Sequence, residues 1–496
     1  MGRSTLGEMS TGHPSFGVPG FWGNLLLVLI LQVGVTGTAM GAKSRPNLII
    51  IYTDEHHFNT LGCYGGATVE TPHIDAIANS GARCTSFYAA TPVCSPSRAS
   101  LISGLYPQNT GVERNDIPLD PKTITFATLL RDQGYATGWC GKWHLAGTGK
   151  PQWAPPSAFG FEDNRFMFNR GHWKKLADGP GGPRVASTNA KGLPDYGLEG
   201  ADEESYATDW LMTKTIEFVE EHRNKPFCYV TSLPDPHGPN RVRAPYNTQF
   251  VGRDIEIPAS YFKPESSVPA WAPKNPKINP RWIRANLPQY YGMVKCIDDN
   301  VGRLLHVLRR LEILDNTVIV LTSDHGDLCG EHGRSEKGNP YEGSARIPFL
   351  LSYLGVVPTG LVIDQALNTT DILPTLMSLM DVPVKHPVDG RNAATLFRGE
   401  SAEDWNDFTV IRSTRGKPWV AAVTDDLKLV LSVQDEPWLF DLREDPEELT
   451  NRFGQRQYQE HVLRLAEGLR AYRNRVGDAF LDEQSLRGQL LKLTVD

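Results

Sequence analysis

Four apolar, β-branched runs along the chain are each followed at once by charged or imidazole side chains. They occupy residues 47–53, 135–139, 227–233 and 317–323. A continuous apolar run of this length is typical of a strand that is buried on both faces of a parallel sheet. Open α/β sheets bind ligands just beyond the carboxyl ends of their strands. The pattern therefore predicts a covered sheet with a functional site at the edge where these runs end.

Other segments show a helical period or none. Apolar residues recur at helical spacing over 301–311, and residues 371–380 predict a second helix. Segments 147–200 and 239–285 are irregular and rich in Gly or Pro. Loops of this length in a compact chain are usually lids or binding loops. We therefore expect these two segments to line a binding site.

The pattern changes after residue 400, where short apolar runs alternate with turns. The runs lie at 408–411, 419–423, 427–433 and 438–441. They predict a small antiparallel sheet, followed by a helix around 456–475. The predicted fold class is α/β: a large mixed, mostly parallel sheet flanked by helices, with a small C-terminal antiparallel β-sheet plus helix subdomain.

The longest apolar run lies near the start of the chain, at residues 25–35. It is shorter than the ~20 residues that a membrane-spanning helix needs. Small residues follow at 36–42, as in a processing site. We expect a cleaved signal peptide over residues 1–42 and a secreted or periplasmic protein, with an uncleaved membrane anchor as the alternative. No later segment is apolar enough to span a membrane, so the mature chain is expected to contain no span.

Composition narrows the class of partner. The chain has 50 Lys and Arg against 57 Asp and Glu, a formal net charge of −7. Binding to a phosphate backbone needs a basic footprint, so a nucleic-acid partner is not expected. The seven cysteines are an odd number and include no CxxC pair, which argues against a zinc ribbon or a thioredoxin-type site.

Cys94 opens the sharpest local motif of the chain, Cys-Ser-Pro-Ser-Arg, which ends at Arg98. Pro96 suits the first turn of a helix, so Cys94 is expected at a helix N-terminus. The free N–H groups and the dipole there favour an anion and lower the pKa of a thiol. The alternative is a buried cysteine that acts as a small apolar residue.

This motif resembles the signature of the type I sulfatases, and further matches follow in the family's order. They lie at residues 54, 141–144, 235–237, 323–326, 331–333, 337–342, 438–442 and 445–448. The resemblance implies an alkaline-phosphatase-like fold, with a catalytic domain over 43–400 and a C-terminal subdomain over 401–496. It implies release of inorganic sulfate from a sulfate monoester, with a sulfated carbohydrate as the expected substrate. It also implies that a maturation enzyme oxidises Cys94 to formylglycine, the nucleophile.

The resemblance further implies a divalent metal ion. Its expected ligands are Asp54, Glu55, Asp324, His325 and an oxygen of the modified Cys94. Glu55 stands where the family more often has Asp or an amide, and His325 stands where several members carry Asn. Calcium is the family expectation, whereas imidazole suits transition metals better. Magnesium and manganese therefore stay open.

Hydrolysis of a sulfate monoester needs cationic groups for the sulfate oxygens, an activated nucleophile and an acid for the leaving oxygen. Arg98, Lys142 and Lys337 can supply the positive charge. His237 is expected to protonate the leaving alcohol, helped by Lys337. His144 is expected to deprotonate the second hydroxyl of the hydrated aldehyde, so that sulfate is expelled without an attack by water.

Three rival functions remain open at this stage. A phosphonate or phosphodiester hydrolase of the same superfamily would share the metal and strand arrangement. A non-enzymatic binding protein would be expected to lack Cys94, Arg98 or Lys337, and all three are present. A thiol hydrolase would use an unmodified Cys94. In segment 147–200, Trp153, His172 and Trp173 could stack on a sugar ring, although core packing is the more frequent use of tryptophan.

Overall fold

The computed structural model describes residues 45–155, 159–401, 403–414, 416 and 418–493. The expected signal peptide, residues 1–42, lies outside the described residues. Within them, no helix is both long enough and apolar enough to cross a membrane.

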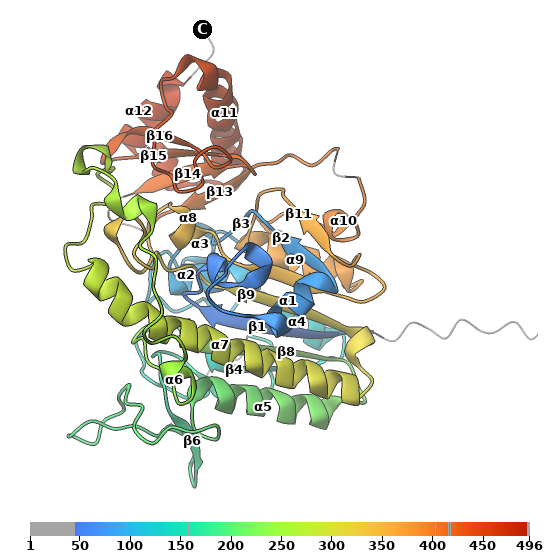
Figure 1. Cartoon of the computed structure of the whole chain (residues 1–496). Coiled ribbons are helices and arrows are strands. Elements are labelled where there is room, and N and C mark those ends of the chain that lie inside the picture. The colour runs from blue at the N-terminus through green and yellow to red at the C-terminus, as the bar shows by residue number, and fades with distance from the viewer. Residues whose placement is uncertain (1–44, 156–158, 402, 415, 417, 494–496) are drawn as a thin grey trace, which may run out of the picture. The chain divides into compact units, whose positions relative to one another are not determined.

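An eight-stranded sheet forms the centre of the fold (Figure 1). In sheet order, its strands are β11 (Leu361–Ile363), β2 (Ala82–Cys84), β10 (Phe349–Ser352), β9 (Thr317–Ser323), β1 (Asn47–Asp54), β8 (Phe227–Pro236), β4 (Ala136–Lys142) and β5 (Met167–Phe168). The four predicted strands are the adjacent β9, β1, β8 and β4, and all are parallel to their neighbours among these four. Only β10 runs antiparallel, to β9 and β2. The mixed, mostly parallel sheet that the sequence predicts is confirmed.

Alternate residues of β1 pack into two different apolar cores, one on each face of the sheet. Ile49 and Ile51 join the first core, while Leu48 and Ile50 join the second. The helices of the first core are α1 (Pro72–Asn79), α5 (Ala207–His222) and α7 (Pro280–Arg310). Those of the second are α2 (Cys94–Ser103), α4 (Phe126–Asp132), α9 (Ile372–Leu379) and α10 (Ala394–Phe397). Cover on both faces explains why the predicted strands are apolar throughout.

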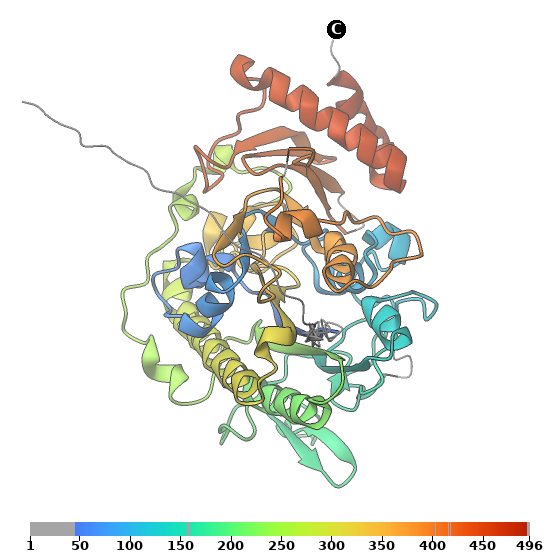
Figure 2. The same ribbon diagram turned by 90° about the vertical axis from the view of Figure 1, so that its right-hand side faces the viewer.

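A second, antiparallel sheet follows residue 400, as predicted. Its strands are β13 (Thr409–Arg412), β14 (Trp419–Val423), β15 (Leu427–Ser432) and β16 (Asp435–Asp441). One face packs on α11 (Gln459–Val476), which lies across the sheet in Figure 2, and on α12 (Gln484–Lys492). The other face packs on aromatic residues of the main part, among them Tyr341 and Trp271.

Short elements complete the described chain. They are the strands β3 (Phe87–Tyr88), β6 (Leu176–Gly179), β7 (Gly182–Val185) and β12 (Leu367–Asn368), and the helices α3 (Pro107–Thr110), α6 (Tyr246–Gln249) and α8 (Glu342–Ala345). Segment 147–200, which was expected to be irregular, holds β5, β6 and β7. Segment 239–285 holds α6 and runs into the first turns of α7. The hairpin of β6 and β7 is antiparallel.

Candidate active site

The carboxyl ends of two neighbouring strands supply the acidic residues of the site. β1 ends at Asp54, and Asp324 and His325 follow β9 directly. The two strands are parallel, with Thr53 beside Ser323, so the residues after them emerge at the same edge of the sheet. The backbone N–H of Asp324 donates to the carbonyl of Thr53 at 3.2 Å, which continues the pairing beyond the strands.

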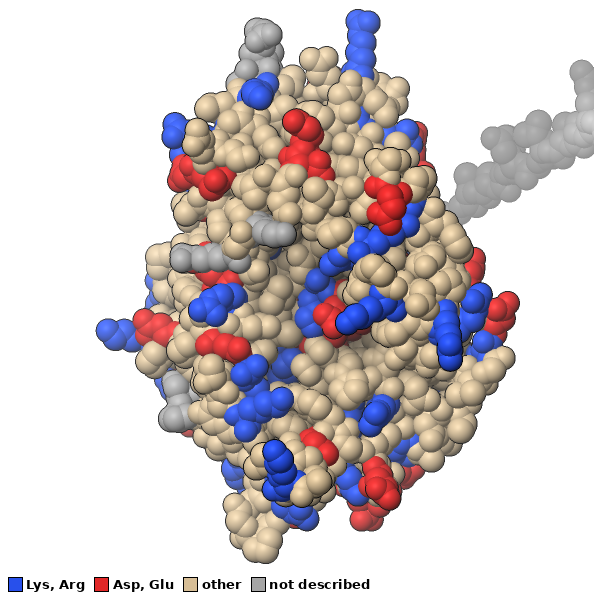
Figure 3. All heavy atoms as spheres, turned by 90° about the vertical axis from the view of Figure 1, so that its left-hand side faces the viewer, with Lys and Arg blue, Asp and Glu red and all other residues tan. Residues whose placement is uncertain are grey.

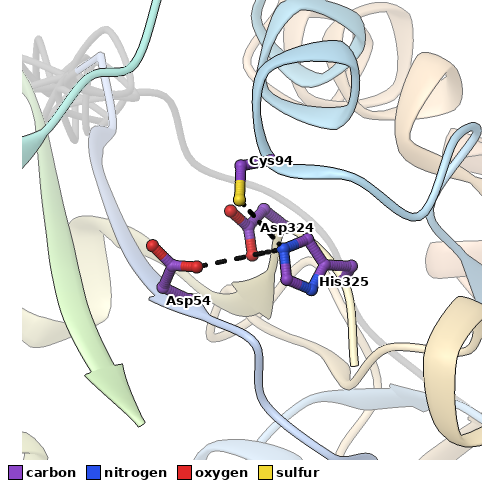
Figure 4. A group of neighbouring side chains, drawn as sticks. All are labelled: Asp54, Cys94, Asp324 and His325. Atoms are coloured by element: carbon purple, nitrogen blue, oxygen red, sulfur yellow. Dashed lines mark hydrogen bonds and ion pairs between the residues drawn. The ribbon is translucent and has the colours of Figure 1, made fainter. Parts of the chain in front are cut away.

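Four buried side chains meet at this edge (Figure 4). The Nε2 of His325 lies 3.2 Å from the Sγ of Cys94 and 3.5 Å from the Oδ1 of Asp324. It lies 3.9 Å from the Oδ1 of Asp54. One ligand atom from each residue lies within 4.8 Å of those from the other three. The structure thus brings together four of the five residues that the sequence analysis assigned to a metal ion.

The chemistry of this group fits a divalent cation. The Oδ1 of Asp54 is buried and has no hydrogen-bond partner among the described residues. His325 Nδ1 lies 3.0 Å from the carbonyl of Gly326 and donates to it, so Nε2 is the ring nitrogen that faces the group and could bind a metal ion. Burial and the charge of Asp54 raise the pKa of Asp324. A cation between these carboxylate oxygens and the imidazole nitrogen would offset the repulsion between Asp54 and Asp324.

Cys94 is the first residue of α2, as predicted, and its residue is only 2% exposed. Burial by itself raises the pKa of a thiol. Here the charges of Lys142, Lys337 and His325 outweigh burial and hold the pKa of Cys94 well below its ordinary value. The seven cysteines, all within the described residues, are free. Cys94 is therefore distinguished by its electrostatic surroundings, since burial raises the pKa of the other six.

Arg98 links the two carboxylates of the site from inside the protein. Its Nε donates to the Oδ2 of Asp324 at 3.0 Å, and its Nη2 donates to the Oδ2 of Asp54 at 3.3 Å. Its Nη1 donates to the carbonyl of Lys142 at 2.8 Å and to the Oγ of Ser232 at 2.9 Å. The guanidinium is fully buried. It thus holds the acidic residues in place and contributes positive charge from behind them.

Two lysines approach the group from different loops. Lys142, the last residue of β4, forms an ion pair with the Oδ2 of Asp54. Lys337 Nζ lies 2.9 Å from the Oε1 of Glu55 and 2.7 Å from the Nε2 of His237. Both ammonium groups lower the pKa of Cys94, so both lie close enough to act on an anion bound there.

The structure does not bring Glu55 into the group of four, although it was expected to be a fifth ligand. The backbone of Glu55 has a φ of 62°, which turns its side chain away from that of Asp54. Its carboxylate instead pairs with Lys337, and its Oε2 lies 3.0 Å from the Nε2 of His237. These partners hold the pKa of Glu55 well below its usual value in spite of burial. Glu55 therefore lies beside His237 and Lys337, outside the group of four.

His144 and Cys94 are held together through the backbone. Ser95 Oγ donates to the carbonyl of His144 at 2.7 Å. The Nε2 of His144 lies 3.4 Å from the Oδ1 of Asp116, and its Nδ1 is buried with no hydrogen-bond partner among the described residues. This buried nitrogen is therefore free to bind or release a proton.

The loop after β8 that carries His237 is fixed by a buried network. The Nζ of Lys174 donates to the Oδ1 of Asp235 at 2.6 Å and to the carbonyl of His237 at 2.9 Å. Tyr206 and Thr208 each donate a hydroxyl to the Oδ2 of Asp235 at 2.6 Å. His237 Nδ1 lies 2.9 Å from the carbonyl of Gly238, which leaves its Nε2 facing Lys337 and Glu55.

The sequence analysis considered His172 only for stacking on a sugar ring and did not assign it to this group. Its Nε2 lies 2.8 Å from the Nζ of Lys142 and 3.8 Å from the Oδ2 of Asp54. His172 lies in the irregular segment 147–200, where no local pattern marks it. The tryptophans of that segment pack inside the protein: Trp173 is 1% exposed, and Trp153 packs against Phe168.

Positive charge also gathers on the surface of the protein. Figure 3 shows a hollow in the face seen from the left of Figure 1, with Lys and Arg side chains around it and Asp or Glu side chains among them. Such a field steers small anions toward a site and raises their local concentration. The surface is thus suited to an anionic ester despite the net charge of −7.

The fold and the site define a hydrolase of anionic esters, with a thiol, two carboxylates and paired cationic groups at one sheet edge. The chain belongs to the sulfatase family, because the Sulfatase family model matches residues 46–382. A second family model, described as N-sulphoglucosamine sulphohydrolase, C-terminal, matches residues 330–475. The protein is therefore a sulfuric ester hydrolase, and the predicted family and class of enzyme are confirmed.

Named relatives cover most of the chain. An ulvan-active sulfatase of Formosa agariphila is 27% identical over 454 residues, which span 88% of this chain and 83% of the relative. An N-acetylglucosamine-6-O-sulfatase of Bacteroides thetaiotaomicron is 27% identical over 505 residues, which span 85% of this chain and 86% of the relative.

Solved structures share the fold. One, in complex with its substrate D-glucosamine-2-N,6-O-disulfate, has a TM-score of 0.71 and 24% identity, covering 89% of this chain and 99% of that one. A phosphonate monoester hydrolase of Agrobacterium radiobacter has a TM-score of 0.72 and 23% identity, covering 88% and 97%. The predicted fold class is thereby confirmed.

Proposed function

We propose that this protein releases inorganic sulfate from a sulfated carbohydrate through a formylglycine derived from Cys94. The observation that carries this proposal is the position of Cys94: it begins a buried helix, 3.2 Å from His325, within a group that includes Asp54 and Asp324. Oxidation of the thiol would place an aldehyde, hydrated to two hydroxyls, where cationic groups favour an anion. The carbohydrate is supported by relatives named for ulvan and N-acetylglucosamine sulfate esters.

The residues that would hold the metal ion are Asp54, Asp324, His325 and an oxygen of the modified Cys94. When bound, a divalent cation would polarise a sulfate oxygen and acidify the hydroxyl at position 94. Calcium fits the two carboxylates, while His325 keeps magnesium and manganese open. Glu55 is left out of the ligand set because its carboxylate pairs with Lys337 and His237.

The remaining polar residues divide between the two sides of the sulfate. Lys142 and Lys337 would neutralise the sulfate oxygens, and Arg98 would hold Asp54 and Asp324 in position. His237, with its Nε2 beside Lys337, would donate a proton to the leaving oxygen. His144, with its buried and unpartnered Nδ1, would take the proton from the hydroxyl at position 94 that remains after attack.

The proposal also covers the export and maturation of the protein, which precede catalysis. We propose that residues 1–42 direct export and are removed, so that the protein acts outside the cytoplasm. A formylglycine-generating enzyme would have to read the segment around Cys94 before folding, because Cys94 and α2 are buried afterwards. Residues 43–400 would form the catalytic domain and residues 401–496 the C-terminal subdomain.

The test combines mass spectrometry with turnover. The protein is produced with a formylglycine-generating enzyme, and the peptide that contains Cys94 is analysed. We expect a mass lower than that of cysteine by about 18 Da, or nearly unchanged if the aldehyde is hydrated. Hydrolysis of an aryl sulfate should accompany this change. It should be lost in Cys94→Ala and retained in Cys63→Ala, a control outside the site.

Two outcomes would contradict the proposal. An unmodified and active Cys94, inactivated by alkylation, would indicate a thiol hydrolase. A phosphate diester hydrolysed more than about tenfold faster than a sulfate ester would favour the phosphonate or phosphodiester hydrolase.

A further inference from the structure

A cavity of about 330 Å³ opens directly beside His237. Glu55 and His237 form its inner end, and the first turns of α7 form one wall through Trp282 and Asn286. The opposite walls are the loop after β8, with Asn240, and residues 335–336. Its volume lies within the ~300–1,000 Å³ of typical small-molecule sites. Because His237 is the proposed donor to the leaving oxygen, this cavity lies where the leaving group would sit.

The walls offer an aromatic ring and hydrogen-bond acceptors. The half-buried indole of Trp282 lines the cavity. The Nδ2 of Asn286 donates to the carbonyl of Trp282 at 2.9 Å, and the Nδ2 of Asn240 donates to the carbonyl of Asn286 at 3.5 Å. Within the described part of the chain, no donor contacts the Oδ1 of either amide. Two amide oxygens with free lone pairs match the hydroxyl donors of a sugar.

The carboxylate side chains that line the cavity have no Lys or Arg among them within the described residues. Asp327 and Glu336 line the cavity beyond Glu55, and its described lining contains no Lys or Arg. Asp327 is held by the backbone N–H groups of Cys329 at 2.8 Å and Glu336 at 3.0 Å.

Lys337 is not part of the cavity lining, and its ammonium group pairs with Glu55 and His237 at the inner end. A second sulfate or a carboxylate on the leaving group would therefore meet Asp327 and Glu336 without a cationic partner on the wall. Like charges a few ångströms apart near a protein surface repel by an amount that changes affinity severalfold or more.

We propose that this cavity is the leaving-group site and that it selects a hydroxyl-rich leaving group without further anionic substituents, such as a neutral sugar. This inference rests on the proposed function, because it assumes that the sulfate ester is cleaved between Cys94 and His237. The inference specifies which kind of leaving alcohol the enzyme accepts, a choice that the sulfate-binding residues do not make.

Competition against an aryl sulfate tests the selectivity. The competitors are hexoses with one sulfate at O2, O3, O4 or O6, and the same hexoses with a second sulfate. Inorganic sulfate is the reference, because it fits the sulfate position without entering the cavity. We expect the best monosulfate to have an inhibition constant about tenfold lower than the best disulfate. Equal inhibition, or tighter inhibition by the disulfates, would overturn the inference.

Three variants connect the selectivity to the cavity. Glu336→Gln should lower the ratio of the disulfate inhibition constant to the monosulfate inhibition constant about threefold. The inhibition constant of inorganic sulfate should change less than about twofold. Glu312→Gln is the matched control, since Glu312 is also exposed and also has a positive φ, but lies before β9 at the opposite edge of the sheet. Trp282→Ala should weaken inhibition by every sulfated hexose about fivefold or more.

The two proposals fail in different ways. A matured protein that hydrolyses no sulfate ester, aryl sulfate included, contradicts the proposed function. A protein that hydrolyses the aryl sulfate but shows an unchanged ratio in Glu336→Gln, or the same change in Glu312→Gln, contradicts the selectivity alone.

Discussion

The imidazole of His172 lies flat on that of His237, with ring centroids 3.4 Å apart and an angle of 9° between the planes. The Nε2 of His172 lies 2.8 Å from Lys142 Nζ, and the Nε2 of His237 lies 2.7 Å from Lys337 Nζ. A lysine is all donor, so each Nε2 accepts when its ring is neutral. The stack therefore joins Lys142, a proposed sulfate-binding residue, to His237, the proposed acid, and we expect His172 to position both.

Replacing His172 should reveal these two contacts separately. His172→Phe keeps a ring on His237 and loses the hydrogen bond with Lys142, whereas His172→Gln can keep the hydrogen bond and loses the stack. We expect His172→Gln to lower kcat for alkyl sulfates about tenfold or more, because a displaced acid transfers its proton poorly. In His172→Phe, which keeps the stack, kcat should depend on the leaving group as it does in the wild type. KM should rise, because the hydrogen bond with Lys142 is lost. A Brønsted plot over a series of leaving groups measures both. Equal losses in the two variants for all leaving groups would show that His172 only supports the local structure.

The acid role of His237 is tested by the leaving group itself. His237→Ala should lower kcat about a hundredfold or more for an alkyl sulfate, whose leaving oxygen must be protonated. For 4-nitrophenyl sulfate, whose leaving group is stable as an anion, the loss should stay below about fivefold. Steady-state kinetics on the two substrates give the comparison. His237 would be excluded as the acid if both substrates lost activity equally.

The central strands were predictable because each one is buried on both faces and is therefore apolar throughout. The run predicted at 47–53 is β1, and the run at 317–323 is β9 without a shift. The start of α7 carried a signal that the Pro-rich surroundings concealed: Asn279 caps Trp282 N–H, and Pro280 occupies the first turn. The helix α12, at 484–492, was not predicted.

The residues of the site could be predicted wherever they follow a strand or begin a helix, as Asp54, Asp324 and Cys94 do. Glu55 could not be placed, because a backbone turn with φ of 62° separates it from its neighbour Asp54. His172 could not be placed either. It reaches Lys142 from an irregular segment, and only the tertiary structure brings them together.

Removal and replacement of the metal ion should show that Asp54 and Glu55 have different roles. We expect a chelator to abolish turnover and added Ca²⁺ to restore it, with Mg²⁺ and Mn²⁺ as comparisons. Asp54→Asn should weaken metal binding by about a hundredfold or more, because it removes charge from a ligand. Glu55→Gln should retain the metal within about threefold and lose turnover instead, through Lys337 and His237. Elemental analysis and metal titration measure the metal content and the metal affinity of the two variants. A metal-free Glu55→Gln would return Glu55 to the ligand set.

The buried ion cluster around Lys428 gives a prediction about stability. Lys428 Nζ lies 2.6 Å from the Oε1 of Glu342 and 2.9 Å from the Oε1 of Glu448, and so joins β15 to α8. Lys428→Met leaves the buried carboxylate of Glu448 without its cation and that of Glu342 with Arg346 alone, at 3.4 Å. It should lower the free energy of unfolding by about 3–5 kcal/mol at pH 8. The exposed control Lys122→Met should change it by less than about 0.5 kcal/mol.

The difference in the free energy of unfolding between the wild type and Lys428→Met should become smaller as the pH falls from 8 to 5. In the wild type, burial and the charge of Glu342 already raise the pKa of Glu448 to about 7, although Lys428 opposes them. Without Lys428, the pKa of Glu448 in the folded protein rises further above its value in the unfolded chain. The pKa of Glu342, which the charge of Lys428 holds below its usual value in the wild type, rises as well. The folded state then binds more protons than the unfolded state over this range, so its stability increases as the pH falls. Urea unfolding of both proteins at pH 5 and pH 8 measures the difference. A gap that stays constant or widens at pH 5 would show that the two carboxylates are not the source of the destabilisation.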